Sequence, residues 1–104
     1  MLRIRLAQQV VDFVGSQAPE PRRRLRQALR DLAQEKGDLK PLEAPLDNYS
    51  RLRVGSYRIV LIYASPRTIE CVFAERRNII YDVFAEEMLA RLLTDEESET
   101  DDEG

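Results

Sequence analysis

The sequence predicts a small α+β domain in which an antiparallel sheet packs on two N-terminal helices. Three observations predict this class: residues 2–6 alternate apolar and charged side chains, residues 21–36 repeat apolar side chains at helical spacing, and two strand-like runs flank Gly55-Ser56. Because a chain of 104 residues has room for one core of ordinary size, we expect a single domain over residues 1–94.

The first strand is predicted over residues 2–6. Strand side chains point alternately to the two faces of a sheet, so we expect Leu2, Ile4 and Leu6 to face the core. A helix of one or two turns is predicted next, over residues 7–14, because three valines there share one helical face.

A longer helix is predicted over residues 21–36, beginning at Pro21 and stopped by Gly37. Its apolar positions recur at helical spacing: Leu25, Ala28, Leu29, Leu32 and Ala33. The opposite side carries five arginines: Arg22, Arg23, Arg24, Arg26 and Arg30. We interpret this basic side as a solvated helix surface in preference to a nucleic-acid site, because charge runs on helices usually face water.

A meander of three strands is predicted in the second half of the chain, after a proline-containing loop over residues 37–48. Residues 49–54 and 57–64 are separated by Gly55-Ser56, the two-residue spacing of a tight hairpin whose glycine takes a positive φ. Residues 68–74 supply the third strand after a proline-containing turn.

The C-terminal part is predicted to hold a helix and a tail. Residues 80–93 carry an amphipathic stripe, which we expect to cover the domain's own core in preference to docking a partner. Residues 95–104 hold seven of the nineteen acidic residues and are predicted to be a disordered acidic tail. We interpret the tail as solvated, in preference to a segment that folds back on the basic residues.

The composition excludes several classes of protein. A chain with 43% hydrophobic and 34% charged residues is not wholly unfolded. It holds no apolar run of the ~20 residues that cross a bilayer and no signal peptide, so a cytoplasmic protein without a membrane partner is expected. With one cysteine and no histidine, we expect no disulfide, no metal site, no cofactor and no histidine-activated nucleophile.

The charge is distributed unevenly along the chain. The formal net charge of the chain is −3. All sixteen Lys and Arg residues lie in residues 1–94, however, and this region contains only twelve of the acidic residues. The predicted domain is therefore basic, which indicates an anionic partner.

Five side chains are candidates for a phosphate-binding site. Arg51 and Arg53 share one face of a predicted strand, and Arg58 lies just beyond the hairpin turn. Arg77 and Tyr81 follow the last strand, whose end lies beside the middle strand in a meander. Guanidinium groups bind phosphate and tyrosine stacks on bases, so the set fits RNA; the alternative is a solvated sheet face with arginine–carboxylate pairs.

Other chemically reactive side chains are interpreted as packing residues. Cys71 lies in an apolar strand without a histidine to activate it, so it is expected to fill the core. Tyr49, Tyr57 and Tyr63 alternate with apolar neighbours and are expected to pack with a polar tip.

The hairpin and the segment after the last strand resemble the RelE/ParE toxin superfamily. Members commonly read Tyr-Arg-Leu-Arg-Val-Gly-Asp-Tyr-Arg-Val on the hairpin and Arg-x-x-x-Tyr after it. This chain reads Tyr49-Ser50-Arg51-Leu52-Arg53-Val54-Gly55-Ser56-Tyr57-Arg58-Ile59-Val60, and then Arg77-Asn78-Ile79-Ile80-Tyr81. The resemblance spans roughly residues 2–90 and implies the order β-α-α-β-β-β with a terminal helix.

The resemblance implies two activities and one kind of partner. RelE-like toxins cut messenger RNA at the ribosomal A site by metal-free attack of a 2′-hydroxyl, and ParE-like toxins inhibit DNA gyrase; both are silenced by a cognate antitoxin. The residues here match the ribonucleases better. Arg51 and Arg53 would bind RNA, Arg58 would hold the scissile phosphate, Arg77 would support the transition-state charge, and Tyr81 would stack on or protonate the nucleotide. The alternative is a non-catalytic binder of gyrase or of the antitoxin alone.

The chain departs from RelE-like ribonucleases at the proton acceptor. Those enzymes tend to place lysine or histidine there, whereas this strand carries arginine, which stays protonated. Glu75 is the only carboxylate near the motif at the end of the last strand. It is interpreted either as a base or, in preference, as a surface acid paired with an arginine.

Overall fold

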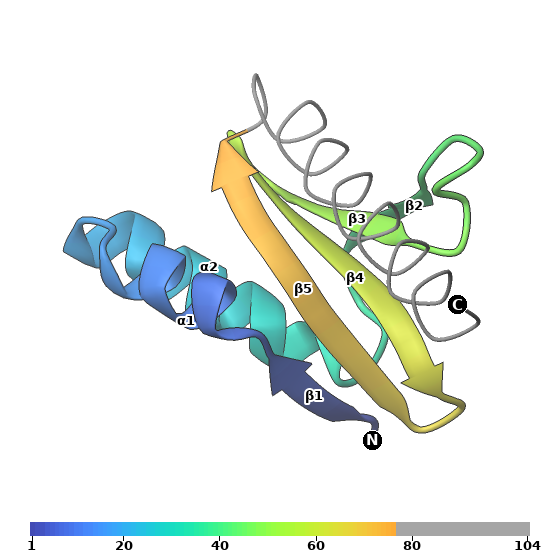
Figure 1. The fold of residues 1–104 in the computed structure, drawn as a ribbon. Helices are drawn as coiled ribbons and strands as arrows, with labels where there is room; N and C mark the ends of the chain where they lie inside the picture. Colours follow the sequence, from blue (N-terminus) through green and yellow to red (C-terminus); the bar gives the residue numbers. More distant parts are fainter. Residues whose placement is uncertain (77–104) are drawn as a thin grey trace, which may run out of the picture.

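A sheet of five strands with two helices on one side forms the described part of the molecule, residues 1–76 of a computed structural model (Figure 1). The elements are β1 (Arg3–Leu6), α1 (Gln8–Gly15), α2 (Pro19–Leu32), β2 (Asp38–Pro41), β3 (Ser50–Val54), β4 (Tyr57–Ser65) and β5 (Thr68–Arg76). The predicted helix over residues 80–93, the predicted tail, Arg77 and Tyr81 lie outside the described residues.

The strand order is β1-β5-β4-β3-β2. Strands β2 to β5 form the predicted kind of antiparallel meander, whereas β1 pairs parallel to β5 at one edge. The α+β prediction is confirmed, with a mixed sheet in place of a wholly antiparallel one. The chain leaves β1 at one edge of the sheet, passes through α1 and α2 over one face, and enters β2 at the other edge. Because β1 is joined to the sheet by this long crossover and not by a tight hairpin, it can pair parallel to its neighbour β5.

The prediction of a loop over residues 37–48 is wrong at β2. There Asp38 pairs with Arg53, Leu39 with Leu52 and Lys40 with Arg51, so this short segment is the other edge strand. Alternation over three residues before a proline is too short to distinguish a strand from a loop in the sequence. An edge strand also needs only one neighbour, so the proline costs no ladder bond on the open side.

Both helices lie close to their predicted positions. Helix α2 begins at Pro19 and not at Pro21, because a proline is tolerated in the first turn, where backbone N–H groups lack helical partners. It ends at Leu32, four residues early, and the chain then turns through Glu35 at φ 56°. Beyond it Gly37 adopts φ 135°, a conformation that L side chains rarely take.

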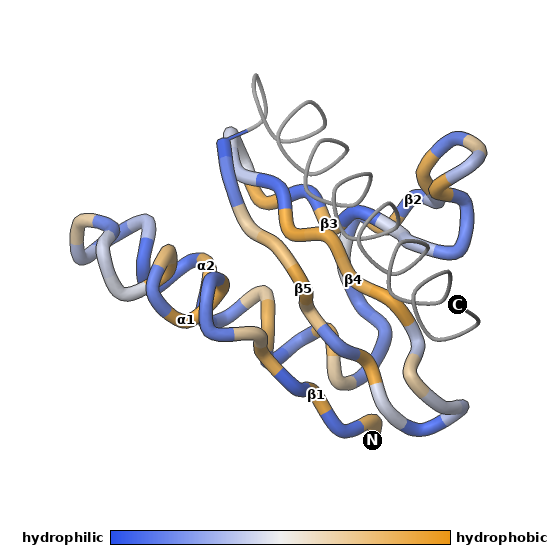
Figure 2. The backbone as a smooth tube through the Cα atoms, viewed as in Figure 1, coloured by the Kyte–Doolittle hydropathy of each residue, from blue (hydrophilic) through white to orange (hydrophobic). Residues whose placement is uncertain are grey.

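The core lies between the helices and the sheet. Figure 2 shows that hydrophobic residues recur along the central strands β4 and β5 and alternate with hydrophilic ones along the helices. Its fully buried large residues are Val10, Leu25, Leu32, Leu52, Ile59, Leu61, Ile69 and Cys71. The predicted inner face of α2 is thus confirmed. Leu2 and Ile4 pack against this core, but Leu6 is 39% exposed because it ends an edge strand.

Gln9 of α1 completes the hydrogen bonding of β5 beyond the end of β1. Its side-chain amide donates to the carbonyl oxygen of Ala74 at 2.7 Å and accepts from the Ala74 N–H at 2.8 Å. Strand β1 pairs with β5 only as far as Cys71, so Ala74 has no strand neighbour on that side. The two bonds satisfy backbone groups that would otherwise be buried without partners.

Cys71 is confirmed as a buried core residue. Burial, and secondarily the charge of Glu70, raise the pKa of its thiol from 9.0 to about 12. Only the thiolate is nucleophilic, so the folded protein presents an unreactive thiol at neutral pH.

We expect iodoacetamide to alkylate Cys71 at least ~100-fold more slowly in the native protein than in urea, because the folded state suppresses both access and ionisation. The measurement is the alkylation rate by mass spectrometry, with the unfolded chain as the control. Equal rates of alkylation in the native and the unfolded protein would contradict a buried thiol.

The raised pKa of Cys71 also predicts that the domain loses stability as the pH rises above the ordinary thiol pKa, because the unfolded chain then releases this proton and the folded one retains it.

Candidate functional site

The candidate arginines lie on the face of the sheet that points away from the helices, here called the arginine face. Leu52 and Ile59 point into the core beneath the helices. Because side chains alternate along a strand, Arg51, Arg53 and Arg58 project to the opposite side. The sequence prediction that Arg51 and Arg53 share a face is confirmed, and the structure adds Arg58 to it.

The strand register aligns these side chains into rows. The first row, here called the charged row, crosses four strands from β2 to β5 and consists of Asp38, Arg53, Arg58 and Glu75. The next row along the strands consists of Lys40, Arg51, Val60 and Phe73. Cross-strand partners have Cβ atoms about 4.5–5.5 Å apart, so each member of a row adjoins the next.

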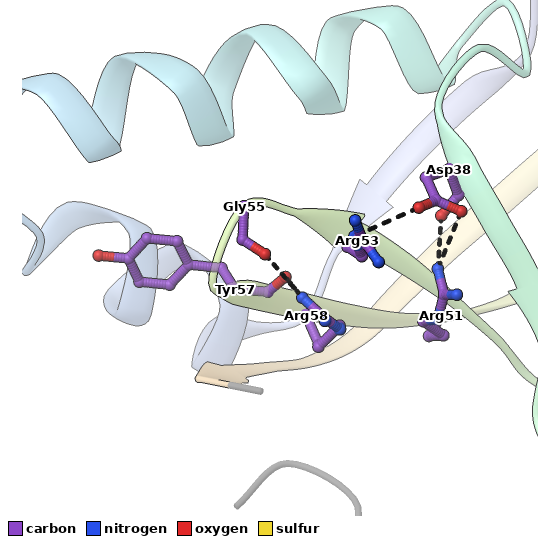
Figure 3. Close-up of polar contacts among 6 residues, drawn as sticks. All are labelled: Asp38, Arg51, Arg53, Gly55, Tyr57 and Arg58. Atoms are coloured by element: carbon purple, nitrogen blue, oxygen red, sulfur yellow. Dashed lines mark hydrogen bonds and ion pairs between the residues drawn. The ribbon is translucent and has the colours of Figure 1, made fainter. Parts of the chain in front are cut away.

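Asp38 joins both arginines of β3 (Figure 3). Its Oδ1 lies 3.2 Å from Nη1 of Arg51 and its Oδ2 lies 3.4 Å from Nε of Arg53. Arg51 also donates to the backbone carbonyl oxygen of Asp38 at 2.9 Å. The Arg51 side chain is 14% exposed, whereas those of Arg53 and Asp38 are 56% and 53% exposed. The exposed pair of Arg53 and Asp38 contributes at most about 1 kcal/mol, so an anion can displace the carboxylate from Arg53.

Arg58 is the most deeply placed charged residue of the row, with 8% exposure. Its Nη1 donates to the carbonyl oxygens of Gly55 and Tyr57, at 2.9 Å each, which fixes the guanidinium against the hairpin turn (Figure 3). Among residues 1–76, no buried side-chain nitrogen or oxygen lacks a partner. Within residues 1–76 no partner is found for its Nε and Nη2 groups, which carry three further N–H donors.

Glu75 adjoins Arg58 in the charged row without forming an ion pair within the described residues. Its Oε1 instead accepts a hydrogen bond from the backbone N–H of Arg76 at 3.0 Å. The preferred interpretation of Glu75, as a carboxylate paired with an arginine, is thus not found in residues 1–76.

Lys40 and Asp38 are site residues that the sequence analysis missed. Both lie on β2, which was assigned to a loop, and both are exposed. The sequence feature that could have indicated this strand is the alternation of Asp38, Leu39 and Lys40, in which charged residues flank a partly buried leucine.

Tyr57 and Tyr49 pack as expected, whereas Tyr63 is largely exposed. Tyr57 is buried against Phe13, with ring centroids 5.9 Å apart, and its hydroxyl lies 3.2 Å from the side-chain oxygen of Gln17. Tyr63 is 44% exposed and donates to Glu35 at 2.8 Å; desolvation and this carboxylate raise the pKa of its hydroxyl. Tyr49 packs against the apolar cluster of Val60 and Phe73 on the arginine face.

The remaining predicted site residues, Arg77 and Tyr81, lie outside the described region, so their relation to the charged row stays a prediction. Within residues 1–76, no three potential metal ligands of the His, Cys, Asp and Glu types lie together. No helix in the same region is long and apolar enough to span a membrane.

No protein-family model and no curated protein sequence matches this chain. Several solved structures are similar to it in fold. The RelB-RelE antitoxin-toxin complex of Methanococcus jannaschii is similar at 26% identity and a TM-score of 0.61, over 77% of this chain and 98% of that one. The toxin-antitoxin complex RelBE2 of Mycobacterium tuberculosis is similar at 19% identity and a TM-score of 0.64, over 73% and 98%. YafQ of Escherichia coli BL21(DE3) is similar at 10% identity and a TM-score of 0.60, over 78% and 99%.

The structure defines an α+β class of protein in which two helices cover one face of a sheet and arginines occupy the other. The fold is that of RelE-like toxins, as the resemblance of the hairpin predicted.

Proposed function

We propose that this protein is the toxin of a toxin-antitoxin pair and acts as a metal-independent endoribonuclease on messenger RNA at the ribosomal A site. The observation that carries the proposal is the charged row: two adjacent arginines, one fixed by the hairpin turn, on the face of the sheet opposite α1 and α2 in a RelE-like fold. Phosphate is the ligand that such neighbouring guanidinium groups bind best.

Each arginine has a distinct role in the proposed reaction. Arg58, whose Nε and Nη2 groups have no partner within residues 1–76, holds the scissile phosphate and stabilises the charge that develops on it. Arg51 and Arg53 bind neighbouring phosphates after these displace Asp38. Arg77 and Tyr81 keep the roles that the resemblance implies, charge support and proton donation to the leaving oxygen.

The proposed partners follow from the same comparisons. Two of the similar structures are complexes of a toxin with its antitoxin, and a cognate antitoxin is therefore proposed for this chain. The site of action is the cytoplasm, where messenger RNA is translated. The reaction uses no cofactor, because positioning and electrostatic stabilisation act on an internal 2′-hydroxyl nucleophile.

The test is to induce the wild type and the double variant Arg58→Ala/Tyr81→Phe at equal expression and to follow growth and messenger-RNA 5′-ends on ribosomes. We expect only the wild type to arrest growth and to create new ends at A-site codons. Arg30→Ala, on the exposed side of α2, is the matched arginine control and is expected to stay toxic.

Two results would overturn the ribonuclease proposal. Growth arrest without new RNA ends would redirect the search to DNA gyrase, the target of the ParE-like alternative. Absence of toxicity, with antitoxin binding retained, would leave a RelE-like fold that only engages its antitoxin.

A further inference from the structure

The proposed reaction needs a proton acceptor that no arginine supplies. Attack by a 2′-hydroxyl on phosphorus releases one proton, and a base positioned for it contributes about 10²–10⁴-fold to the rate. Guanidinium groups stay protonated at any physiological pH, and the chain contains no histidine. Among the residues that the structure describes, the carboxylates of the arginine face are the side chains that can accept this proton.

The strands carry three carboxylates on this face: Asp38, Glu70 and Glu75. Asp38 lies on β2, two strands away from Arg58 on β4, and is bound to two guanidinium groups in the absence of RNA. Glu70 is bound to Arg5 at 2.9 Å, toward the β1 edge. A carboxylate oxygen that already accepts from a guanidinium group is not free to contact the hydroxyl of a bound RNA. Among residues 1–76, Glu75 is the strand carboxylate without such an ion pair.

Glu75 also has the right neighbour. Its cross-strand partner is Arg58, the proposed ligand of the scissile phosphate, and Arg53 follows in the same row. The 2′-oxygen lies on the nucleotide whose phosphate is attacked, so a base must stand next to the phosphate ligand. The bond from the Arg76 N–H occupies only one carboxylate oxygen, Oε1, and orients the group.

Lys40 is the competing candidate on the arginine face. It lies in the neighbouring row beside Arg51, two strands away from β4. Lysine is protonated at neutral pH unless its surroundings are apolar, and Lys40 is exposed. Its position and charge suit phosphate binding better than proton removal.

We propose that Glu75 is the general base of this protein, an inference that rests on the proposed ribonuclease function. The Glu75 carboxylate takes the proton of the 2′-hydroxyl as the 2′-oxygen bonds to phosphorus. The bond from phosphorus to the 5′-oxygen breaks, and that oxygen takes a proton from Tyr81. The products are a 2′,3′-cyclic phosphate and a 5′-hydroxyl, with no oxidant, reductant or metal consumed.

The test is single-turnover cleavage of a message on purified ribosomes by the wild type, Glu75→Gln and Glu70→Gln. Glu75→Gln keeps an oxygen that accepts the Arg76 N–H but removes the base, so we expect cleavage to slow by at least ~100-fold. Glu70→Gln makes the same change on the same strand and face and is expected to cleave at the wild-type rate. Affinity for ribosomes carrying a 2′-O-methyl message, which lacks the attacking hydroxyl, is expected to be unchanged by Glu75→Gln.

A pH–rate profile separates a base from a structural residue. The wild-type rate is expected to fall on acidification as the carboxylate takes up a proton, and this limb is expected to be lost in Glu75→Gln. In the described region the charged groups nearest Glu75 are its cross-strand partner Arg58 and its chain neighbour Arg76, followed along the row by Arg53 and then Asp38, and all four are unchanged in both proteins.

The outcomes distinguish this inference from the proposed function. Wild-type protein that cuts no message on ribosomes overturns both. Wild-type cleavage with Glu75→Gln within about threefold of it overturns the role of Glu75 and leaves the ribonuclease standing. Loss of ribosome affinity in Glu75→Gln, in parallel with cleavage, would make Glu75 a binding residue and overturn its role as a base.

Discussion

Replacing Leu52 with alanine is expected to lower the free energy of unfolding by about 2–5 kcal/mol, the range found for large-to-small changes in packed cores. Leu52 is 1% exposed and lies in the core cluster between the sheet and both helices. Its neighbours are strands and helices on all sides, so the cavity cannot collapse easily. Urea denaturation followed by circular dichroism measures the effect. Leu6→Ala, at a leucine that is 39% exposed, is the control and is expected to cost less than about 1 kcal/mol.

Gly37 provides a second readout of the same packing. A Cβ at Gly37 would lie 2.7 Å from Cδ1 of Leu52, and the residue also adopts φ 135°. Gly37→Ala therefore adds a clash to backbone strain in the wild type, but only strain when Leu52→Ala has removed the clashing methyl group. We expect its cost to be smaller by about 1 kcal/mol in the Leu52→Ala background. Strict additivity, or a Leu52→Ala cost no greater than that of Leu6→Ala, would contradict this packing.

The parts of the fold that the sequence predicted are those with a local signal. The hairpin is confirmed because Gly55-Ser56 lies between two runs of strand-forming residues, and Gly55 has the positive φ that the turn requires. Helix α2 has a regular apolar stripe over fourteen residues. The shared face of Arg51 and Arg53 follows from strand geometry alone.

The parts that the sequence did not predict depend on contacts between distant segments. Strand β2 is four residues long and is defined by its pairing with β3. Asp38 thereby reaches Arg51 and Arg53, thirteen and fifteen residues away along the chain. Gln9 bonds to Ala74 across 65 residues. No periodicity within a window of residues encodes such pairs, because register is set by the whole sheet.

The candidate site shows the same division. Residue types made Arg51, Arg53 and Arg58 candidate phosphate ligands, because that chemistry belongs to the side chain itself. The order of the residues in the charged row is set by the strand register across β2, β3, β4 and β5. That order places Glu75 beside Arg58 and Asp38 beside Arg53, which no feature of the sequence alone predicts.

Asp38→Asn is expected to strengthen RNA binding, because the wild-type carboxylate competes with phosphate for Arg51 and Arg53. The variant keeps the backbone carbonyl that accepts from Arg51, so that side chain stays oriented, and Arg53 loses its charged partner. Removing a unit charge near a surface phosphate is worth about 1 kcal/mol in water, which corresponds to roughly fivefold in affinity. The probe is a 2′-O-methyl oligoribonucleotide, whose binding is measured by fluorescence anisotropy without cleavage.

The dependence on salt tests whether Asp38 competes with phosphate directly. If Arg53 gains one phosphate contact in Asp38→Asn, the slope of log affinity against log salt steepens by about 0.7 for single-stranded RNA. Asp12→Asn changes the net charge equally but lies on α1, which covers the opposite face of the sheet, and is expected to leave the slope unchanged. Equal effects of the two substitutions would mean that net charge alone matters. Weaker binding by Asp38→Asn would mean that Asp38 orients the arginines for RNA and does not compete with it.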